Sequence, residues 1–204
     1  CADPRRVESV VNAIANYQEG FQEGLCAGRQ NKIESENVLV GRSQAICEIR
    51  SAVNLIAKSQ ATVLLTGESG TGKEVVAQLI HAQSNRAQKQ FVALNCATLP
   101  KDIIENELFG HEKGAFTGAL QKKIGCFELA DGGTLLFDEI AEMTLETQAK
   151  LLRAIETHKF RRLGGNEEIN VDVRMIAATN KPITAALKSK ELREDLYYRL
   201  SVIE

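Results

Sequence analysis

The stretch Val63-Leu-Leu-Thr-Gly-Glu-Ser-Gly-Thr-Gly-Lys-Glu74 decides the fold. Four mostly apolar, β-favouring residues run directly into a glycine-spaced turn that ends in lysine. The spacing Gly67-x4-Gly72-Lys73 is typical of a phosphate-binding loop. Glycines permit positive φ and let backbone amides approach an anion, and the lysine adds a point charge. We therefore predict a strand, a phosphate-binding loop and a helix over Val75–Ala82.

The residue after the lysine departs from the general motif. Glu74 stands where Ser or Thr usually contacts Mg²⁺, so metal binding has to rely on other groups. The alternative interpretation is a strand–turn–helix corner whose glycines serve packing alone. The preceding strand, Lys73 and the helical pattern that follows favour the phosphate-binding loop.

The composition is that of an ordinary folded domain. The 204 residues are 44% hydrophobic and 25% charged and carry a net charge of -2, so no global basic field indicates nucleic-acid binding. The chain shows no membrane-spanning apolar run and no signal-peptide pattern. Its 5 cysteines and 3 histidines form no CxxC or HExxH pattern, which fits a reducing cytosol and argues against a zinc site. Because the chain begins at Cys1 rather than Met, we expect it to be a fragment.

Residues 1–36 predict an amphipathic helix that precedes the main domain. Apolar residues from Val7 to Leu25 recur at spacings of three and four. Two interpretations stay open: a linker helix coupled to an upstream sensor domain, and a surface helix or frayed extension. We expect the main domain to cover residues 37–204, with Ser43 as the N-cap of its first helix.

Strands that alternate with helices predict an α/β fold with a mostly parallel sheet covered on both faces. Asp138 and Glu139 close an apolar run that starts at Thr134. A nucleotide hydrolase needs such a pair, because one carboxylate holds Mg²⁺ and the next orients or deprotonates water. Parallel strands bring their carboxyl ends to one edge, so the pair should lie beside the phosphate-binding loop. Two other predicted strands end near the polar residues Asn95 and Asn180.

A glycine-rich segment follows a short predicted helix near Lys101–Leu108. Its central hexapeptide is Gly114, Ala115, Phe116, Thr117, Gly118 and Ala119. The glycines argue against a continuous helix. An exposed phenylalanine on such a loop suggests a contact with a partner, and the alternative is that Phe116 packs into the core.

These motifs together resemble the central AAA+ ATPase domain of bacterial enhancer-binding proteins, the activators of sigma-54 RNA polymerase. The segment Gly67–Glu74 resembles this family's form of the Walker A loop, which includes the glutamate after the lysine. The hexapeptide Gly114–Ala119 spells GAFTGA, and the longer segment that begins at Glu107 is highly specific to the family. Leu135–Glu139 is similar to the Walker B strand, and Leu192–Leu200 to the arginine-finger helix.

The resemblance implies an AAA+ P-loop NTPase core with a parallel five-stranded sheet between helices. It implies ATP and Mg²⁺ as cofactors, with phosphates bound by Gly67, Glu68, Ser69, Gly70, Thr71, Gly72, Lys73 and Glu74. Asp138 would bind Mg²⁺ and Glu139 would activate water. Asn95 would be the switch asparagine that holds the Walker B glutamate, and Asn180 would be sensor I.

The same resemblance implies contacts with other subunits and with sigma-54. Arg193 and Arg199 resemble arginine fingers donated to the neighbouring subunit's ATP in a ring, expected to be a hexamer. Since they are six residues apart they share no helical stripe, and one could serve as finger and the other in subunit contact. The alternative for either is a surface salt bridge. Phe116 and Thr117 resemble the loop tip that contacts sigma-54.

The chain departs from the family pattern at Glu204, where the family continues into a helical lid and often a helix-turn-helix domain. DNA contacts are therefore expected only through a domain absent from this chain, and no membrane contact is expected. The predicted function is ATP-driven remodelling of sigma-54 RNA polymerase closed complexes in the cytoplasm. The alternatives are a nucleotide-dependent switch that does not hydrolyse ATP, and a general AAA+ remodeller, which the GAFTGA sequence argues against.

Overall fold

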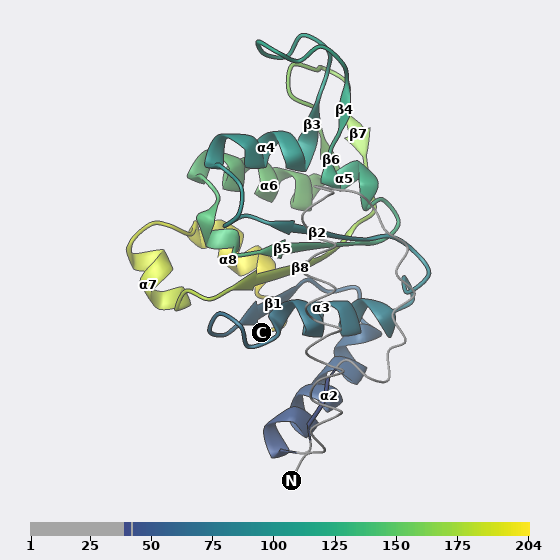
Figure 1. Ribbon diagram of the computed structural model, residues 1–204, viewed down its shortest axis with the longest axis vertical. Coiled ribbons are helices and arrows are strands. Elements are labelled where there is room, and N and C mark those ends of the chain that lie inside the picture. The colour runs from purple at the N-terminus through teal and green to yellow at the C-terminus, as the bar shows by residue number, and fades with distance from the viewer. Residues whose placement is uncertain (1–38, 42) are drawn as a thin grey trace, which may run out of the picture.

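The computed structural model describes residues 39–41 and 43–204. The helix predicted within residues 1–36 lies outside these described residues. Figure 1 shows a central sheet with helices on both sides. The helices are α2 (Gln44–Ala57), α3 (Lys73–Ala82), α4 (Lys101–Phe109), α5 (Cys126–Leu129), the 3-10 helix η1 (Ile140–Glu142), α6 (Leu145–Thr157), α7 (Ile183–Lys188) and α8 (Glu194–Leu200). The strands are β1 (Val63–Thr66), β2 (Phe91–Asn95), β3 (Gly110–His111), β4 (Lys123–Ile124), β5 (Thr134–Asp138), β6 (Lys159–Phe160), β7 (Ile169–Asn170) and β8 (Arg174–Thr179).

The central sheet has the strand order β1-β8-β5-β2, and all of its pairings are parallel. The parallel sheet between helices is confirmed, but the described strands number four in this sheet rather than the predicted five. Beside β1, where a fifth strand would pair, Val63 forms a single isolated bridge with Ile203. There the amide of Leu64 donates to the carbonyl of Ile203 at 2.9 Å. A bridge of this kind fixes the position of a neighbouring strand without forming a ladder.

The core consists of two apolar layers, one on each face of the sheet. Strand β5 supplies both layers, because Leu135 and Phe137 join one cluster while Leu136 joins the other. All three side chains are fully buried, as expected for a parallel strand covered on both faces. Helices α4 and α6 cover the first face and α2 and α3 the second (Figure 1). This packing holds the carboxyl ends of the strands in a fixed arrangement.

Two short antiparallel ribbons project from the same end of the molecule (Figure 1). Strands β3 and β4 pair with each other, and β6 pairs with β7. The amide of Glu112 donates to the carbonyl of Leu163 at 3.0 Å, and the amide of Leu163 donates to Gly110 at 3.0 Å, so the ribbons are joined. Gly110 is required there, because a Cβ at this position would lie 2.3 Å from the carbonyl oxygen of Lys123.

Local expectations were met except at some boundaries. The hydroxyl of Ser43 accepts from the amide of Ile46, which confirms it as the N-cap of α2. The last helix begins at Glu194, so Arg193 is its N-cap rather than a helical residue. The short strand β7 ends at Asn170. Within the described part of the chain, no helix is both long and apolar enough to cross a lipid bilayer.

Candidate functional site

The predicted phosphate-binding loop joins β1 to α3. Gly70 and Gly72 have φ values of 79° and 88°, a region that favours glycine. Gly72 is also the N-cap of α3 and makes no side-chain cap hydrogen bond. The first amides of α3 lack carbonyl partners within the helix, as in any helix, and no N-cap side chain satisfies them. This arrangement is suited to binding an anion such as a phosphate.

Lys73 folds back over the loop that precedes it. Its Nζ donates to the carbonyls of Gly67 at 2.9 Å and Glu68 at 3.1 Å. The same Nζ lies 3.7 Å from Oε1 of Glu139, and both side chains are largely buried. The strand end that carries the paired acids is thus at the same sheet edge as the loop, as the sequence predicted.

The two acids at the end of β5 are held by different neighbours. Nδ2 of Asn95 donates to Oδ2 of Asp138 at 3.0 Å. Oε2 of Glu139 accepts from the backbone amide of Asn180 at 2.8 Å. The structure therefore brings both predicted asparagines to the acids, but Asn95 holds Asp138 and not the glutamate. Glu139 has a φ of 55°, which is uncommon for a residue with a side chain and often marks a functional position.

Crowded carboxylates make this site favourable to a cation. Burial raises the pKa of Asp138, the neighbouring Glu139 raises it further, and Lys73 opposes the shift. Burial also raises the pKa of Glu74, with Asp138 as the second cause. Mg²⁺ commonly takes only one or two carboxylates and completes its shell with water and phosphate. Among the residues described, no group of three or more metal-ligating side chains occurs.

A hollow of about 330 Å³ opens beside the loop and the end of β8. It is lined by Thr66, Gly67, Glu68, Asn180, Lys181, Pro182, Ile183, Thr184 and Glu204. Lys181 is held there by Glu142 at 2.8 Å and by Glu191 at 2.6 Å. Of the lining side chains, Lys181 is thus already paired with carboxylates outside the lining.

The two predicted finger arginines lie at opposite ends of α8. Arg193 pairs with Asp195, with Nη2 2.6 Å from Oδ2, and its backbone amide donates to Gln148. Arg199 is exposed in the last turn of the helix. Within residues 43–204, neither arginine forms an ion pair with the phosphate-binding loop of its own chain. Their placement leaves the guanidinium groups accessible from outside the molecule.

The hexapeptide 114–119 forms the tip between β3 and β4. The amide of Gly114 donates to Ala119 at 2.9 Å, and the amide of Ala119 donates to Phe116 at 3.0 Å, which closes the tip. Phe116 is 47% exposed. Its ring and the ring of His111 pack edge to face, with a distance of 4.9 Å between the ring centroids. The alternative that Phe116 packs into the core is therefore wrong. Thr117 is also exposed.

Sequence reasoning missed the arginine that supports this tip. Arg162, only 8% exposed, donates through Nε to Glu128 at 2.7 Å and through Nη1 to Glu112 at 2.6 Å. Hydrogen bonds to these carboxylates raise the pKa of Arg162, and Arg162 in turn lowers that of Glu112. The available signal in the sequence was a pair of adjacent arginines, which does not show which one is buried.

The chain is similar in sequence to known proteins over most of its length. The sequence profile of the Sigma-54 interaction domain matches residues 39–204. The Nif-specific regulatory protein of Bradyrhizobium diazoefficiens is 48% identical over 198 residues, which cover 97% of this chain and 34% of that protein. The transcriptional regulatory protein FlbD of Caulobacter vibrioides is 48% identical over 99% of this chain and 45% of its own length. The chain thus spans less than half of each of these curated relatives.

Solved structures show the same likeness. NtrX from Brucella abortus in complex with ADP has a TM-score of 0.75 and 42% identity, covering 81% of this chain and 36% of that protein. The P-loop NTPase domain of a sigma-54 activator from E. coli has a TM-score of 0.53 at 23% identity, over 79% of this chain and 93% of that chain, and shows the fold alone. The profile match and these relatives establish that the chain belongs to the Sigma-54 interaction domain family, the AAA+ domains of sigma-54-dependent transcriptional activators.

Proposed function

We propose that this chain hydrolyses ATP and uses the reaction to remodel the sigma-54 RNA polymerase closed complex through the GAFTGA loop. The observation that carries the proposal is the meeting of Lys73 and Glu139 at 3.7 Å, beside the first amides of α3. A cation, a carboxylate and an anion-binding helix end lie at one sheet edge, which is the arrangement that phosphoryl transfer to water needs.

The residues divide the chemistry between them. Lys73 and the amides of the loop bind and orient the phosphates. Asp138 would hold Mg²⁺ if that ion is bound with ATP, and the ion would then supply positive charge beside the phosphates. Glu139 orients the attacking water and accepts its proton. The backbone amide of Asn180, 2.8 Å from Oε2 of Glu139, fixes that carboxylate. Asn95 orients Asp138 through the bond between their side chains.

The arginines on α8 support a role between subunits. Arg193 and Arg199 are accessible and do not pair with their own phosphate-binding loop in the described chain. A guanidinium donated to a neighbour's γ-phosphate stabilises charge in the transition state and is worth about 10³–10⁵ in rate in other NTPases. We infer a cytoplasmic ring, expected to be a hexamer, in which each active site is completed by the next protomer.

The GAFTGA tip supports a contact with sigma-54. Phe116 is an exposed apolar side chain between small residues, on a ribbon well away from the phosphate-binding loop (Figure 1). An apolar tip of this kind suits a reversible contact that one nucleotide state presents and another withdraws. Promoter binding would need a helix-turn-helix domain outside this chain.

Glu139→Ala tests hydrolysis. The variant should bind ATP with an affinity near that of the wild type, because Lys73 and the loop are intact, while turnover falls by about 10²–10⁴. Binding is measured with a fluorescent ATP analogue and turnover by phosphate release, using the full-length protein over a range of concentrations. Turnover should rise with protein concentration, since neighbouring protomers complete the site. A variant that turns over at the wild-type rate would refute the role of Glu139.

Thr117→Ala tests the coupling to transcription. ATP turnover should stay within about twofold of the wild type, since surface changes away from the site are usually mild. Open-complex formation by sigma-54 holoenzyme should be lost, and holoenzyme with another sigma factor serves as the control. Survival of sigma-54 transcription would show that the loop is not the contact.

A further inference from the structure

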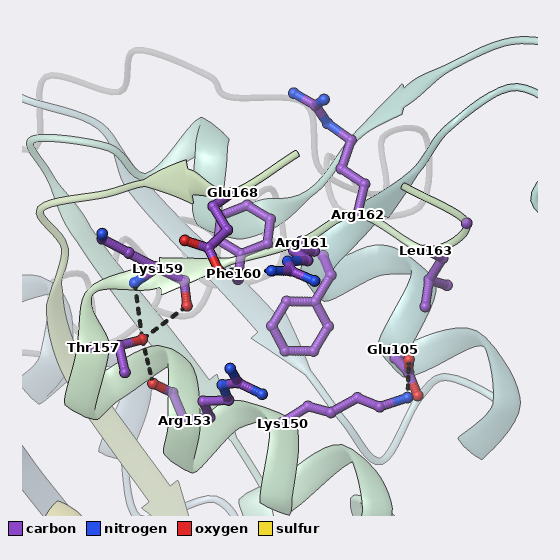
Figure 2. A pocket seen from close by; sticks show the side chains of 12 residues that line it. Glu105, Lys150, Arg153, Thr157, Lys159, Phe160, Arg161, Arg162, Leu163 and Glu168 are labelled. Atoms are coloured by element: carbon purple, nitrogen blue, oxygen red, sulfur yellow. Dashed lines mark hydrogen bonds and ion pairs between the residues drawn. The ribbon is translucent and has the colours of Figure 1, made fainter. Parts of the chain in front are cut away.

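A second cavity lies at the base of the two ribbons, on the face covered by α4 and α6. Its volume is about 630 Å³, roughly twice that of the hollow beside the phosphate-binding loop. Figure 2 shows it between α6 and the turn after β6. It is lined by Glu105, Phe109, Lys150, Arg153, Thr157, Lys159, Phe160, Arg161, Arg162, Leu163, Gly164 and Glu168. We call this cavity the basic groove.

The lining carries more positive than negative charge. Its basic side chains are Lys150, Arg153, Lys159, Arg161 and Arg162, and its acidic side chains are Glu105 and Glu168. Lys150 is paired with Glu105 at 2.7 Å, and Arg161 with Glu168 at 2.8 Å. The net charge of the lining side chains is therefore positive after these pairs cancel.

Two of the cations have no carboxylate of their own. The side chains of Arg153 and Lys159 form no hydrogen bond or ion pair within the described residues, and both residues are exposed. In Figure 2, Arg153 rises from α6 below Arg161, and Lys159 stands at one end of the groove near Glu168. Cations that flank a groove without partners attract an anionic ligand.

Glu168, one of the two acidic side chains of the lining, lies near three cations. The pKa of Glu168 is lowered chiefly by its hydrogen bond with Arg161, and the charges of Lys159 and Arg153 lower it further. Three cations thus act on the same small region of space. A second carboxylate entering beside Glu168 would meet Arg153 and Lys159, whose charges Glu168 only partly offsets.

The base of the groove is apolar. The rings of Phe109 and Phe160 pack at a tilt of 39° with a centroid distance of 5.7 Å, and Leu163 also lines the cavity. Concave sites with an apolar base and a few charged groups bind side chains and small ligands. A phosphodiester backbone carries no apolar side chain that could cover the aromatic base. The combination favours a polypeptide that presents both carboxylates and an apolar residue.

We propose that the basic groove binds an acidic segment of a partner protein, with carboxylates on Arg153 and Lys159 and an apolar side chain against the aromatic base. The groove adjoins the GAFTGA tip, because a Cβ at Gly164 would lie 2.7 Å from the Cβ of Ala115. A partner held at the tip could therefore fill the groove as well. The proposal does not depend on nucleotide hydrolysis.

The test is fluorescence anisotropy with a labelled peptide of alternating glutamate and leucine, with the full chain and without nucleotide. Arg153→Glu should weaken binding by about tenfold or more at low salt, since an attraction becomes a repulsion. Lys159→Glu should weaken it as well, because the charge of Lys159 acts on the same position beside Glu168. The matched control is Lys89→Glu, which makes the same charge change in the exposed loop before β2 and should alter binding by less than about twofold.

Three further measurements make the outcome decisive. Circular dichroism melts establish that the variants fold, and Arg153→Gln provides a milder change that should give an intermediate loss. A glutamine–leucine peptide should bind weakly, and the affinity of the acidic peptide should fall with salt. ATP turnover should not change in Lys159→Glu, which separates this proposal from the proposed ATPase. The proposal is overturned if the acidic peptide does not bind, if Lys89→Glu weakens it equally, or if single-stranded DNA occupies the groove instead.

Discussion

Replacing Arg162 with alanine should destabilise the protein far more than replacing its neighbour Arg161. Arg162 is 8% exposed, and its carboxylate partners Glu128 and Glu112 are 16% and 32% exposed. Removing one partner of a buried ion pair costs about 3–5 kcal/mol, because the other charge stays buried without a partner. Since Glu128 keeps some contact with water, we expect the lower end of that range, about 3 kcal/mol.

The matched control is Arg161→Ala. Arg161 and its partner Glu168 are 53% and 46% exposed, and exposed pairs contribute about 0–1 kcal/mol. For a chain of this size, 1 kcal/mol corresponds to a shift in Tm of about 2–4 °C. Arg162→Ala should therefore lower Tm by about 6–12 °C, and Arg161→Ala by about 4 °C or less.

Thermal unfolding followed by circular dichroism measures both shifts. Adding Glu128→Gln to Arg162→Ala should restore a large part of the lost stability, because the unpaired charge is removed. Equal shifts for the two arginines, or no recovery in the double variant, would refute the argument. ATP turnover of the folded variants reports separately whether the loop support affects hydrolysis.

The remaining predictions concern pH, backbone and subunit contacts. Burial lowers the pKa of His81 in the folded protein, so below the ordinary histidine pKa of about 6.5 the unfolded chain binds more protons, and the free energy of unfolding should fall as pH drops through that range. Urea unfolding of His81→Leu should show a free energy of unfolding that depends less on pH. An unchanged pH dependence in that variant would contradict this. Gly110→Ala should cost more than Gly132→Ala by denaturant unfolding, because both have a φ near 70° but only the first places a Cβ against the backbone. Similar losses would show that φ strain alone decides the effect. Arg199→Ala should leave Tm nearly unchanged, as for other exposed residues, yet lower ATP turnover of the assembled protein by about 10³ or more. Full turnover in that variant would exclude Arg199 as a finger and leave Arg193 as the candidate.

The parts of the site that depend on strand order could be predicted from the sequence. Lys73 follows one parallel strand and Glu139 follows another, so a parallel sheet brings them to the same edge whatever the details of packing. Phe116 could be placed on a loop because the glycines around it disfavour regular structure. These predictions rest on backbone rules that a sequence displays directly.

Other features depend on side-chain choices that the sequence does not display. Asn95 could reach either acid, and the register of β2 against β5 pairs it with Asp138. Arg161 and Arg162 are adjacent, yet Arg161 is exposed and Arg162 is buried. The expected fifth strand does not form in the described chain, because Ile203 makes one bridge and not a ladder of hydrogen bonds.

The two acids differ in what anchors them, and this difference has a consequence for tolerance to substitution. Glu139 is held by the main-chain amide of residue 180, which every amino acid except proline possesses. Asp138 is held by the side-chain amide of Asn95, which few residues can replace. Variation at position 180 should thus leave the glutamate in place, whereas variation at position 95 removes one anchor of the aspartate and leaves its hydrogen bond with the backbone of Glu139. A library of substitutions at positions 95 and 180 would test whether the main-chain anchor of Glu139 tolerates sequence change better than the side-chain anchor of Asp138.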